Sequence, residues 1–296
     1  MLSVQARSAN TRKAYAFDWA DFAGWCKRAG RESLPATSDT VQLYSVGLAK
    51  AGRAVATIER RAAAIAAEHA AAGYRSPIDV DVREVLQGLR RHLGAAPKCK
   101  TALTPDDLVR LVESLPEGAM GTRDRALLLV GFASSLRRSE LAALSLADVD
   151  EVRDGLVIRL GRCKTDQTGV GRELGVHRGA HGVSCPARAL AAWLAVRGRW
   201  PGPLFCFVDH RGGVVQRAMS GESIAVRIKS ACKRAGLDPA RYSGHSLRAG
   251  CATAASANGA SELAIMGRTG HKSVAMVGRY VRHANLFAVD PLAGVL

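Results

Sequence analysis

The sequence predicts a mainly α-helical protein, with an N-terminal helical bundle at residues 1–93 and a mixed, mainly helical domain at 104–296 that holds a small antiparallel sheet. Three observations predict this class. Apolar residues recur at helical spacing through most of the 296-residue chain. A linker at residues 94–103, made of small residues, lysines and a proline, shows no periodicity. Residues 154–160 and 171–178 have the pattern typical of strands.

The first domain is expected to be a bundle of helices. Aromatic and apolar residues recur every third or fourth position from Tyr15 to Cys26, and Gly30 follows as a C-terminal stop. Ser38 is expected to cap the second helix, and the third is rich in alanine. The helices are expected over residues 10–30, 38–50, 54–73 and 81–93.

The second domain is expected to begin with Thr104 as an N-cap and Pro105 at the first helical position. The helical segment 122–146 is expected to break at the pair Ser134-Ser135. A polar turn then joins the two strands into a hairpin. Further helices are expected over residues 185–196, 223–236, 245–259 and 261–270.

Charge is the first indication of a partner. The chain has 42 Lys and Arg against 26 Asp and Glu, a formal net charge of +16. Residues 1–100 contain 16 basic and 9 acidic groups, and the remainder contains 26 and 17, so both halves are basic. This distribution favours a long polyanion that contacts both domains. A generally basic, solubilising surface is the alternative that composition leaves open.

Several classes of protein are not indicated. No apolar run is long enough to span a membrane, and the N-terminus does not resemble a signal peptide. Phosphate-binding glycine loops, H-E-x-x-H and acidic clusters are missing, so no cofactor and no metal are expected. Seven cysteines without a C-x-x-C pair fit a reducing cytoplasm. His181, Cys185, Cys206 and His210 could form a zinc quartet, but Cys206 lies in an apolar run that reads as a buried strand.

Five short motifs carry a resemblance to a known family. They occur in the order "SSLRRSEL" (134–141), "GRCKT" (161–165), "SGHSLRAG" (243–250), "TGHKS" (269–273) and "GRYVR" (278–282). Each motif alone is weak. Together, with 23 residues from Arg248 to His271 and nine from His271 to Tyr280, they resemble the tyrosine recombinase (phage integrase) family, which includes the Cre-like and Xer-like recombinases. The helical bundle resembles the core-binding domain of that family.

The resemblance implies a set of catalytic residues and one supporting acid. Each of them alone also has an ordinary structural interpretation, such as a surface ion pair or a packed aromatic ring. As an ordered set they are expected to cut DNA, with Tyr280 as nucleophile, His245 as its base and Lys164 as the acid for the leaving oxygen. The residues are Arg137, Lys164, His245, Arg248, His271 and Tyr280, supported by Glu140.

The residue types suit this chemistry. Attack on a phosphodiester adds negative charge to the non-bridging oxygens, and planar arginine forks can hold those oxygens through paired hydrogen bonds. Preorganised donors of this kind are usually the largest catalytic contribution. Without a metal, that stabilisation must come from Arg137, Arg248 and His271. A tyrosine has a pKa near 10 and therefore needs a base and cationic neighbours in order to attack at neutral pH.

The resemblance implies a site-specific DNA recombinase that works without metal or ATP, through a 3′-phosphotyrosyl link and a Holliday junction. The expected partners are a duplex recombination site and three further copies of the chain in a homotetramer. Accessory proteins are an additional option, and no membrane is expected as a partner. Without DNA, a monomer or weak association is expected. The apolar C-terminal segment 286–296 is expected to dock into a neighbouring copy, or to fold back on its own domain. The alternatives are a type IB topoisomerase and a DNA-binding protein without activity.

Two departures from the family pattern concern single motifs. The family commonly has Thr-Gly where this chain has Ser134-Ser135, and the turn that holds Lys164 is longer than in many members.

Basic and polar side chains in both domains are expected to contact DNA. These are Arg12, Lys13, Arg60, Arg61, Arg90, Arg91, Lys98, Lys100, Arg241 and Ser243.

Overall fold

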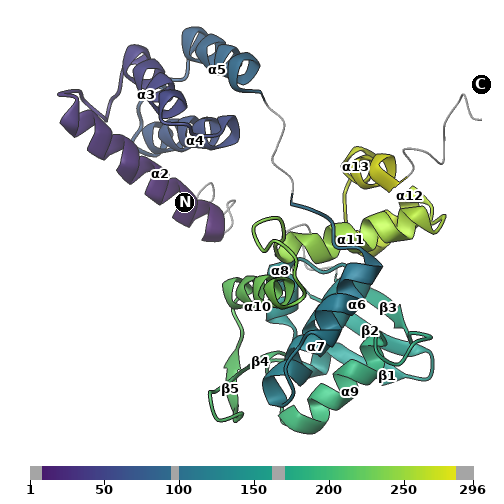
Figure 1. The fold of residues 1–296 in the computed structure, drawn as a ribbon. Helices are drawn as coiled ribbons and strands as arrows, with labels where there is room; N and C mark the ends of the chain where they lie inside the picture. The colour runs from purple at the N-terminus through teal and green to yellow at the C-terminus, as the bar shows by residue number, and fades with distance from the viewer. Residues whose placement is uncertain (1–8, 95–99, 162–170, 285–296) are drawn as a thin grey trace, which may run out of the picture. The chain divides into compact units, whose positions relative to one another are not determined.

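The structure is a computed structural model that describes residues 9–94, 100–161 and 171–284. The chain divides into two compact units, residues 1–98 and 99–296. Each unit is described by itself (Figure 1). The predicted class is confirmed: the fold is mainly helical, and the second unit also contains small antiparallel sheets. Within the described residues, no helix is long and apolar enough to cross a membrane.

The first unit is a bundle of helices around one apolar core. Its helices are α2 (Ala9–Arg28), α3 (Ser38–Lys50), α4 (Val55–Ala71) and α5 (Val80–Leu93). Phe22 and Cys26 of α2 are fully buried in this core, as their helical spacing predicts. The N-cap of α3 is Thr37, whose Oγ1 accepts from the backbone N of Thr40 at 3.2 Å, so the expectation that Ser38 caps this helix is wrong.

Ion pairs join α2 to α4 inside the first unit. Nε and Nη2 of Arg60 donate to Asp18 at 2.8 and 3.0 Å. Arg61 is 5% exposed and donates through Nη1 to Asp21 and, at 2.6 Å, to the hydroxyl of Tyr44. Arg61 was expected to contact DNA, but its guanidinium is turned into this buried cluster. Its position assigns it to the packing of the bundle rather than to a surface that meets phosphate.

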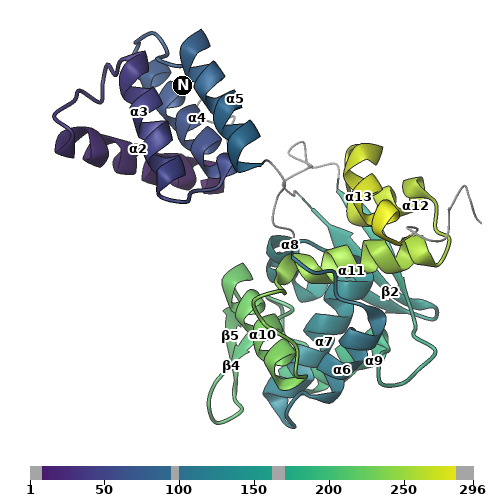
Figure 2. The ribbon, with the colours of Figure 1, turned by 45° about the horizontal axis from the view of Figure 1, so that its top comes forward.

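The second unit is built around α7, which contacts α6, α8, α9, α11 and β3. The helices of this unit are α6 (Pro105–Glu113), α7 (Ala119–Ser134), α8 (Arg138–Ala143), α9 (Pro186–Arg197), α10 (Gly221–Arg234), α11 (Gly244–Ala257), α12 (Glu262–Thr269) and α13 (Val274–Ala284). A short 3-10 helix, η1 (Leu146–Asp148), follows α8. Figures 1 and 2 both show α11, α12 and α13 side by side at one end of the unit.

Two antiparallel sheets flank the helices. The first has the order β1-β2-β3, and its strands are β1 (Val149–Val152), β2 (Gly155–Leu160) and β3 (Arg172–His177). β2 and β3 are the predicted hairpin, with Ile158 opposite Leu174. The second sheet pairs β4 (Cys206–Val208) with β5 (Val214–Ala218). β4 lies in the apolar run interpreted as a strand, whereas β1, β5 and α13 were not predicted.

The packed part of the second unit begins before Thr104, within the segment that was predicted to be a linker. Thr104 caps α6 through Oγ1, which accepts from Asp107 N at 3.0 Å, as predicted. Leu103, expected in the linker, is 1% exposed and donates its backbone N–H to the carbonyl of Ser246 at 3.1 Å. A Cβ at Gly250 would lie 2.0 Å from the Leu103 carbonyl oxygen, so only glycine permits this close approach.

A buried arginine–aspartate–arginine group connects α7, β4 and α10. Asp124 is 1% exposed, and its Oδ1 accepts from Nε and Nη2 of Arg123 at 2.9 and 2.7 Å. Its Oδ2 accepts from Nε of Arg227 at 2.7 Å. Arg123, 2% exposed, also donates to the carbonyl of Cys206 at 3.2 Å. One buried carboxylate therefore balances two cations, the buried Arg123 and the partly exposed Arg227.

Candidate active site

The turn between α7 and α8 presents Arg137. The expected helix break lies here, where Ser135 has a φ of 56°, in the left-handed region that a non-glycine residue adopts at some cost. Leu136 is buried in the core, and Arg137 follows at the N-cap of α8. The serine that stands where the family commonly has glycine therefore adopts the conformation typical of glycine and leaves Arg137 in place.

Glu140 holds Arg137 from one turn further along α8. Its Oε2 accepts from the backbone N of Arg137 at 2.8 Å, and its Oε1 accepts from Nη1 at 2.7 Å. Burial alone would raise the pKa of the Glu140 carboxyl, but these hydrogen bonds and the charges of Arg137 and Arg172 hold the pKa below its usual value. Glu140 is therefore a carboxylate at neutral pH and orients Arg137.

Arg248 is the most buried cation among the described residues of the site. It is 1% exposed on α11, its Nη1 donates to the carbonyl of Ser135 at 2.9 Å, and its Nη2 lies 3.1 Å from Nε2 of His271. Burial and the neighbouring charge of Arg137 lower the pKa of Arg248 to about 10. The guanidinium therefore stays charged at neutral pH and keeps further N–H donors for a ligand.

His271 lies between Arg248 and the end of α12. Its Nδ1 is 2.7 Å from Oγ1 of Thr269. Burial, followed by the charges of Arg248 and Arg137, lowers the pKa of His271 to about 4. The imidazole is therefore neutral in the folded protein at neutral pH.

Tyr280 of α13 lies next to His245 of α11. Oη of Tyr280 lies 3.1 Å from Nε2 of His245, and its ring centroid lies 5.8 Å from that of His271. The ring packs against the apolar cluster that includes Ile265 and Val277. Desolvation and the charges of Arg248 and Arg137 lower the pKa of His245, so its imidazole is neutral at neutral pH and can accept the phenol proton.

Arg172 was not predicted and lies beside these residues at the start of β3. Its Nη1 donates to the carbonyls of Gly267 and Arg268 at 3.1 and 3.0 Å, and its Nη2 lies 3.9 Å from Oε2 of Glu140. It connects the carboxylate that orients Arg137 with the end of α12 that precedes His271. The only sequence signal was a basic residue at the end of the hairpin, which is common on strand surfaces.

The predicted catalytic residues fall into two groups. The structure brings Arg137, Glu140, His245, Arg248, His271 and Tyr280 together in the second unit. Lys164 lies outside the described residues, and so does Lys98; the side chains of Arg279 and Arg282 are likewise not described. The assigned role of Lys164 therefore stays a prediction.

The residues expected to contact DNA are mostly at the surface. Exposed side chains are those of Arg12, Lys13, Arg90, Arg91, Lys100 and Arg241. Besides Arg60 and Arg61, whose partners are given above, three of these residues have protein partners. Arg90 pairs with Glu59, Lys100 donates to the carbonyl of Ala240 at 2.7 Å, and Ser243 caps α11 by accepting from His245 N at 3.2 Å. Contact with DNA stays a prediction for these residues and for Arg60, whereas the guanidinium of Arg61 lies in the buried cluster of the first unit.

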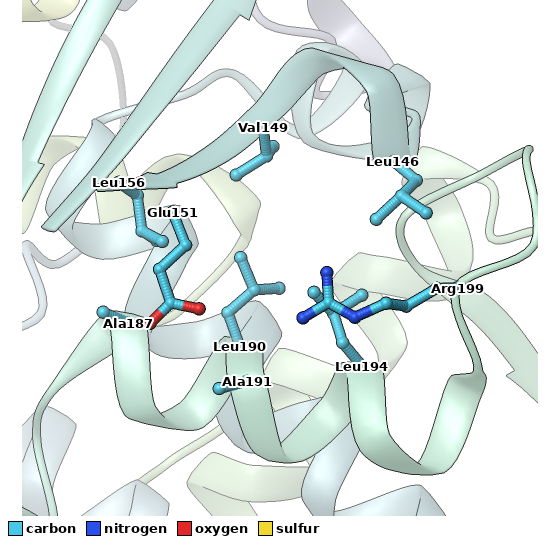
Figure 3. A pocket seen from close by; sticks show the side chains of 9 residues that line it. All are labelled: Leu146, Val149, Glu151, Leu156, Ala187, Leu190, Ala191, Leu194 and Arg199. Carbon is cyan, nitrogen blue, oxygen red and sulfur yellow. The ribbon is translucent and has the colours of Figure 1, made fainter. Parts of the chain in front are cut away.

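Among the described residues, neither a metal-binding group nor the pocket between β1, β2 and α9 contributes to this site. Among the described residues, no three His, Cys, Asp or Glu side chains gather as a metal-binding group, and Cys206 is buried on β4. Figure 3 shows a small hollow between β1, β2 and α9 that is lined mostly by apolar side chains, with Glu151 and Arg199 among them. Among the described residues, its lining includes none of the proposed catalytic side chains.

The second unit is expected to lose stability as the pH falls from about 6.5 to about 4, the range between the usual pKa of histidine and that of folded His271. In this range the unfolded chain binds a proton that the folded ring does not, so acid favours unfolding; below it both states are protonated. Urea unfolding at a series of pH values measures the slope. His271→Asn should make the change of unfolding free energy with pH less steep. His177→Asn, which replaces an exposed ring, should leave that slope unchanged. Equal slopes in wild type and His271→Asn would contradict the assignment.

Comparison with known proteins identifies the family. A sequence profile of the phage integrase family matches residues 101–286. The chain is 35% identical to an integrase/recombinase XerD homolog of Selenomonas ruminantium, over 97% of this chain and 86% of that protein. It is 28% identical to the recombinase Cre of Escherichia phage P1, over 94% and 85%.

Solved structures share the fold. The Tn1549 transposon integrase in complex with transposon right end DNA has a TM-score of 0.68 at 15% identity, over 96% of this chain and 94% of that chain. A lambda integrase dimer bound to a COC′ core site has a TM-score of 0.63 at 16% identity, over 95% and 91%. Together, the profile match and the identity to the XerD homolog show that this chain belongs to the phage integrase family of tyrosine recombinases.

Proposed function

We propose that this recombinase cuts and rejoins duplex DNA at specific sites through a covalent 3′-phosphotyrosyl intermediate. One observation carries the proposal: Oη of Tyr280 lies 3.1 Å from Nε2 of His245, while the buried Arg248 contacts His271 beside them. A nucleophile within hydrogen-bond reach of a neutral base, next to a fixed cation, is the arrangement that covalent catalysis on a phosphodiester needs.

In the first step, the arginines bind the scissile phosphate. Arg137 and Arg248 donate to its non-bridging oxygens, where negative charge increases as the tyrosine attacks. Glu140 and the Ser135 carbonyl hold the two guanidinium groups before DNA binds. Because these donors are preorganised, little reorganisation is needed in the transition state.

In the second step, Tyr280 becomes linked to DNA. His245 Nε2 takes the phenol proton, Oη attacks phosphorus, and the bond from phosphorus to the 5′ oxygen breaks. We assign Lys164 to protonate that leaving oxygen. The 5′ hydroxyl of another strand then attacks the phosphotyrosine, which reforms a phosphodiester and releases Tyr280. Bond energy is conserved, so neither ATP nor a metal is needed, and exchange of one strand pair leaves a Holliday junction.

The substrate and assembly follow from this chemistry. The exposed basic side chains of both units contact the backbone of a duplex recombination site, in the nucleoid of the cytoplasm. Each chain carries one nucleophile, Tyr280, so four cuts in two duplexes require a homotetramer on DNA. The expectation that residues 286–296 dock into a neighbouring copy concerns a segment outside the described residues and stays a prediction.

A covalent adduct assay tests the proposal. The preferred site is first selected from a random duplex library, and a duplex nicked beside the cut position then traps the intermediate because the freed strand end diffuses away. In EDTA and without ATP, the wild-type chain should give a protein–DNA band that resists denaturant. The absence of any adduct would leave the DNA-binding alternative. Relaxation of supercoiled plasmid without exchange between two sites would instead indicate the topoisomerase.

A further inference from the structure

His271 is held by partners on both ring nitrogens. Nη2 of Arg248 lies 3.1 Å from Nε2, and Oγ1 of Thr269 lies 2.7 Å from Nδ1. Thr269 ends α12, is 1% exposed, and its Oγ1 also lies 2.7 Å from the carbonyl of Ile265. These contacts form one chain of hydrogen bonds from the catalytic arginine to the backbone of α12.

The positions of the protons follow from the chemistry of the groups. A guanidinium only donates, so Nε2 must accept with its lone pair, and the ring proton of the neutral imidazole must be on Nδ1. Nδ1–H then donates to Oγ1 of Thr269, whose own hydroxyl donates to the Ile265 carbonyl. In the other tautomer, Nε2–H and an N–H of Arg248 would face each other, and the Ile265 carbonyl would lose the hydroxyl.

We propose that Thr269 is a positioning residue that holds His271 in its Nδ1–H tautomer, so that Nε2 accepts from Arg248 and orients this guanidinium before DNA binds. The catalytic meaning of this inference rests on the proposed function. It changes the part expected of His271: in the DNA-free enzyme the ring is an acceptor for the arginine rather than a direct donor to phosphate. Arg248 then directs its remaining N–H groups to the phosphate.

The backbone after α12 makes the contact possible. Gly270 adopts a left-handed conformation, with φ of 65°, which turns the chain so that the His271 ring returns to the side chain two residues before it. A Cβ at Gly270 would lie 2.7 Å from Nη1 of Arg172, which donates to the carbonyls of Gly267 and Arg268. The end of α12 is therefore held in place independently of the hydroxyl of Thr269.

Nitrogen-15 NMR of the histidine rings tests the proposal without any need for activity. His271 is assigned by the signal that His271→Asn lacks. In wild type at neutral pH, Nδ1 should be protonated and Nε2 should not. Thr269→Val keeps the volume but removes the acceptor, and its ring signals should move towards the average of the two tautomers. Covalent adduct formation should slow about tenfold, as expected when a buried N–H loses its partner.

Two variants serve as controls. Thr269→Ser keeps the hydroxyl and should keep the tautomer and the rate. Ser45→Ala removes a buried hydroxyl that bonds the carbonyl of Val41 at 2.8 Å in the first unit, and should change neither. A wild-type ring protonated on Nε2, or Thr269→Val with wild-type signals or the wild-type rate, would overturn the proposal. If wild type forms no DNA adduct, the proposed function fails, and the ring signals still decide the tautomer.

Discussion

Tyr280→Phe is expected to bind its DNA site and to form no covalent adduct. The variant loses Oη, the only atom that could attack phosphorus in the proposed reaction, while its ring keeps the packing against Ile265 and Val277. Duplex affinity should change by less than about tenfold, since a single hydrogen bond contributes about 0.5–1.5 kcal/mol and phosphate contacts supply most of the binding. Gel shift and denaturing gel on the same nicked duplex measure the two properties.

The matched control is Tyr242→Phe. The hydroxyl of Tyr242 lies 3.4 Å from Asp107 in the second unit and takes no part in the proposed reaction. This variant should form the adduct at the wild-type rate. An adduct that persists in Tyr280→Phe would show that another side chain is the nucleophile, and an adduct lost in both variants would point to a general loss of structure.

Asp124→Ala is expected to destabilise the second unit by about 3–5 kcal/mol, the usual cost of removing one partner from a buried ion pair. The substitution leaves the buried guanidinium of Arg123 and the partly exposed guanidinium of Arg227 without the carboxylate that they share. Urea unfolding followed by circular dichroism measures the loss. The contacts within the first unit are unchanged by this substitution.

Asp150→Ala provides the comparison for Asp124. Asp150 pairs with Arg159 at the surface, where both side chains are about half exposed, 51% and 49%. Such pairs contribute about 0–1 kcal/mol, so this variant should unfold at nearly the wild-type urea concentration. Equal losses of unfolding free energy in the two variants would show that the buried group stabilises the protein no more than the surface pair does.

The motifs that we propose to be catalytic could be picked out from the sequence because each lies on one short segment. His245 and Arg248 are on successive turns of α11, and Glu140 is one turn from Arg137, so a local pattern is enough to place each pair on one face. Helix boundaries were predictable where a cap and an apolar repeat agree, as at Thr104. Between Thr37 and Ser38 the two neighbouring hydroxyl residues are equally suited to cap, and only the tertiary structure selects the first.

The residues whose positions the sequence did not reveal contact residues that are far away in the sequence. Arg172 reaches carbonyls at Gly267 and Arg268, and nothing in its own strand indicates that destination. Arg61 looked like a surface charge because Asp18 and Asp21, which pair with it, lie on a different helix. Strand β5 has mostly exposed side chains and therefore lacks an apolar alternation to reveal it.

The contact between Ser135 and Arg248 links the turn before Arg137 to the buried arginine of the proposed site. Ser135 adopts a conformation that glycine takes freely, and its carbonyl is held by Nη1 of Arg248 at 2.9 Å. The same arginine that we propose binds phosphate thus also holds the carbonyl of an unfavourable turn. Loss of the Arg248 side chain would therefore leave the Ser135 carbonyl without this donor. A substitution at Arg248 therefore alters both the proposed phosphate-binding group and the support of the turn that presents Arg137.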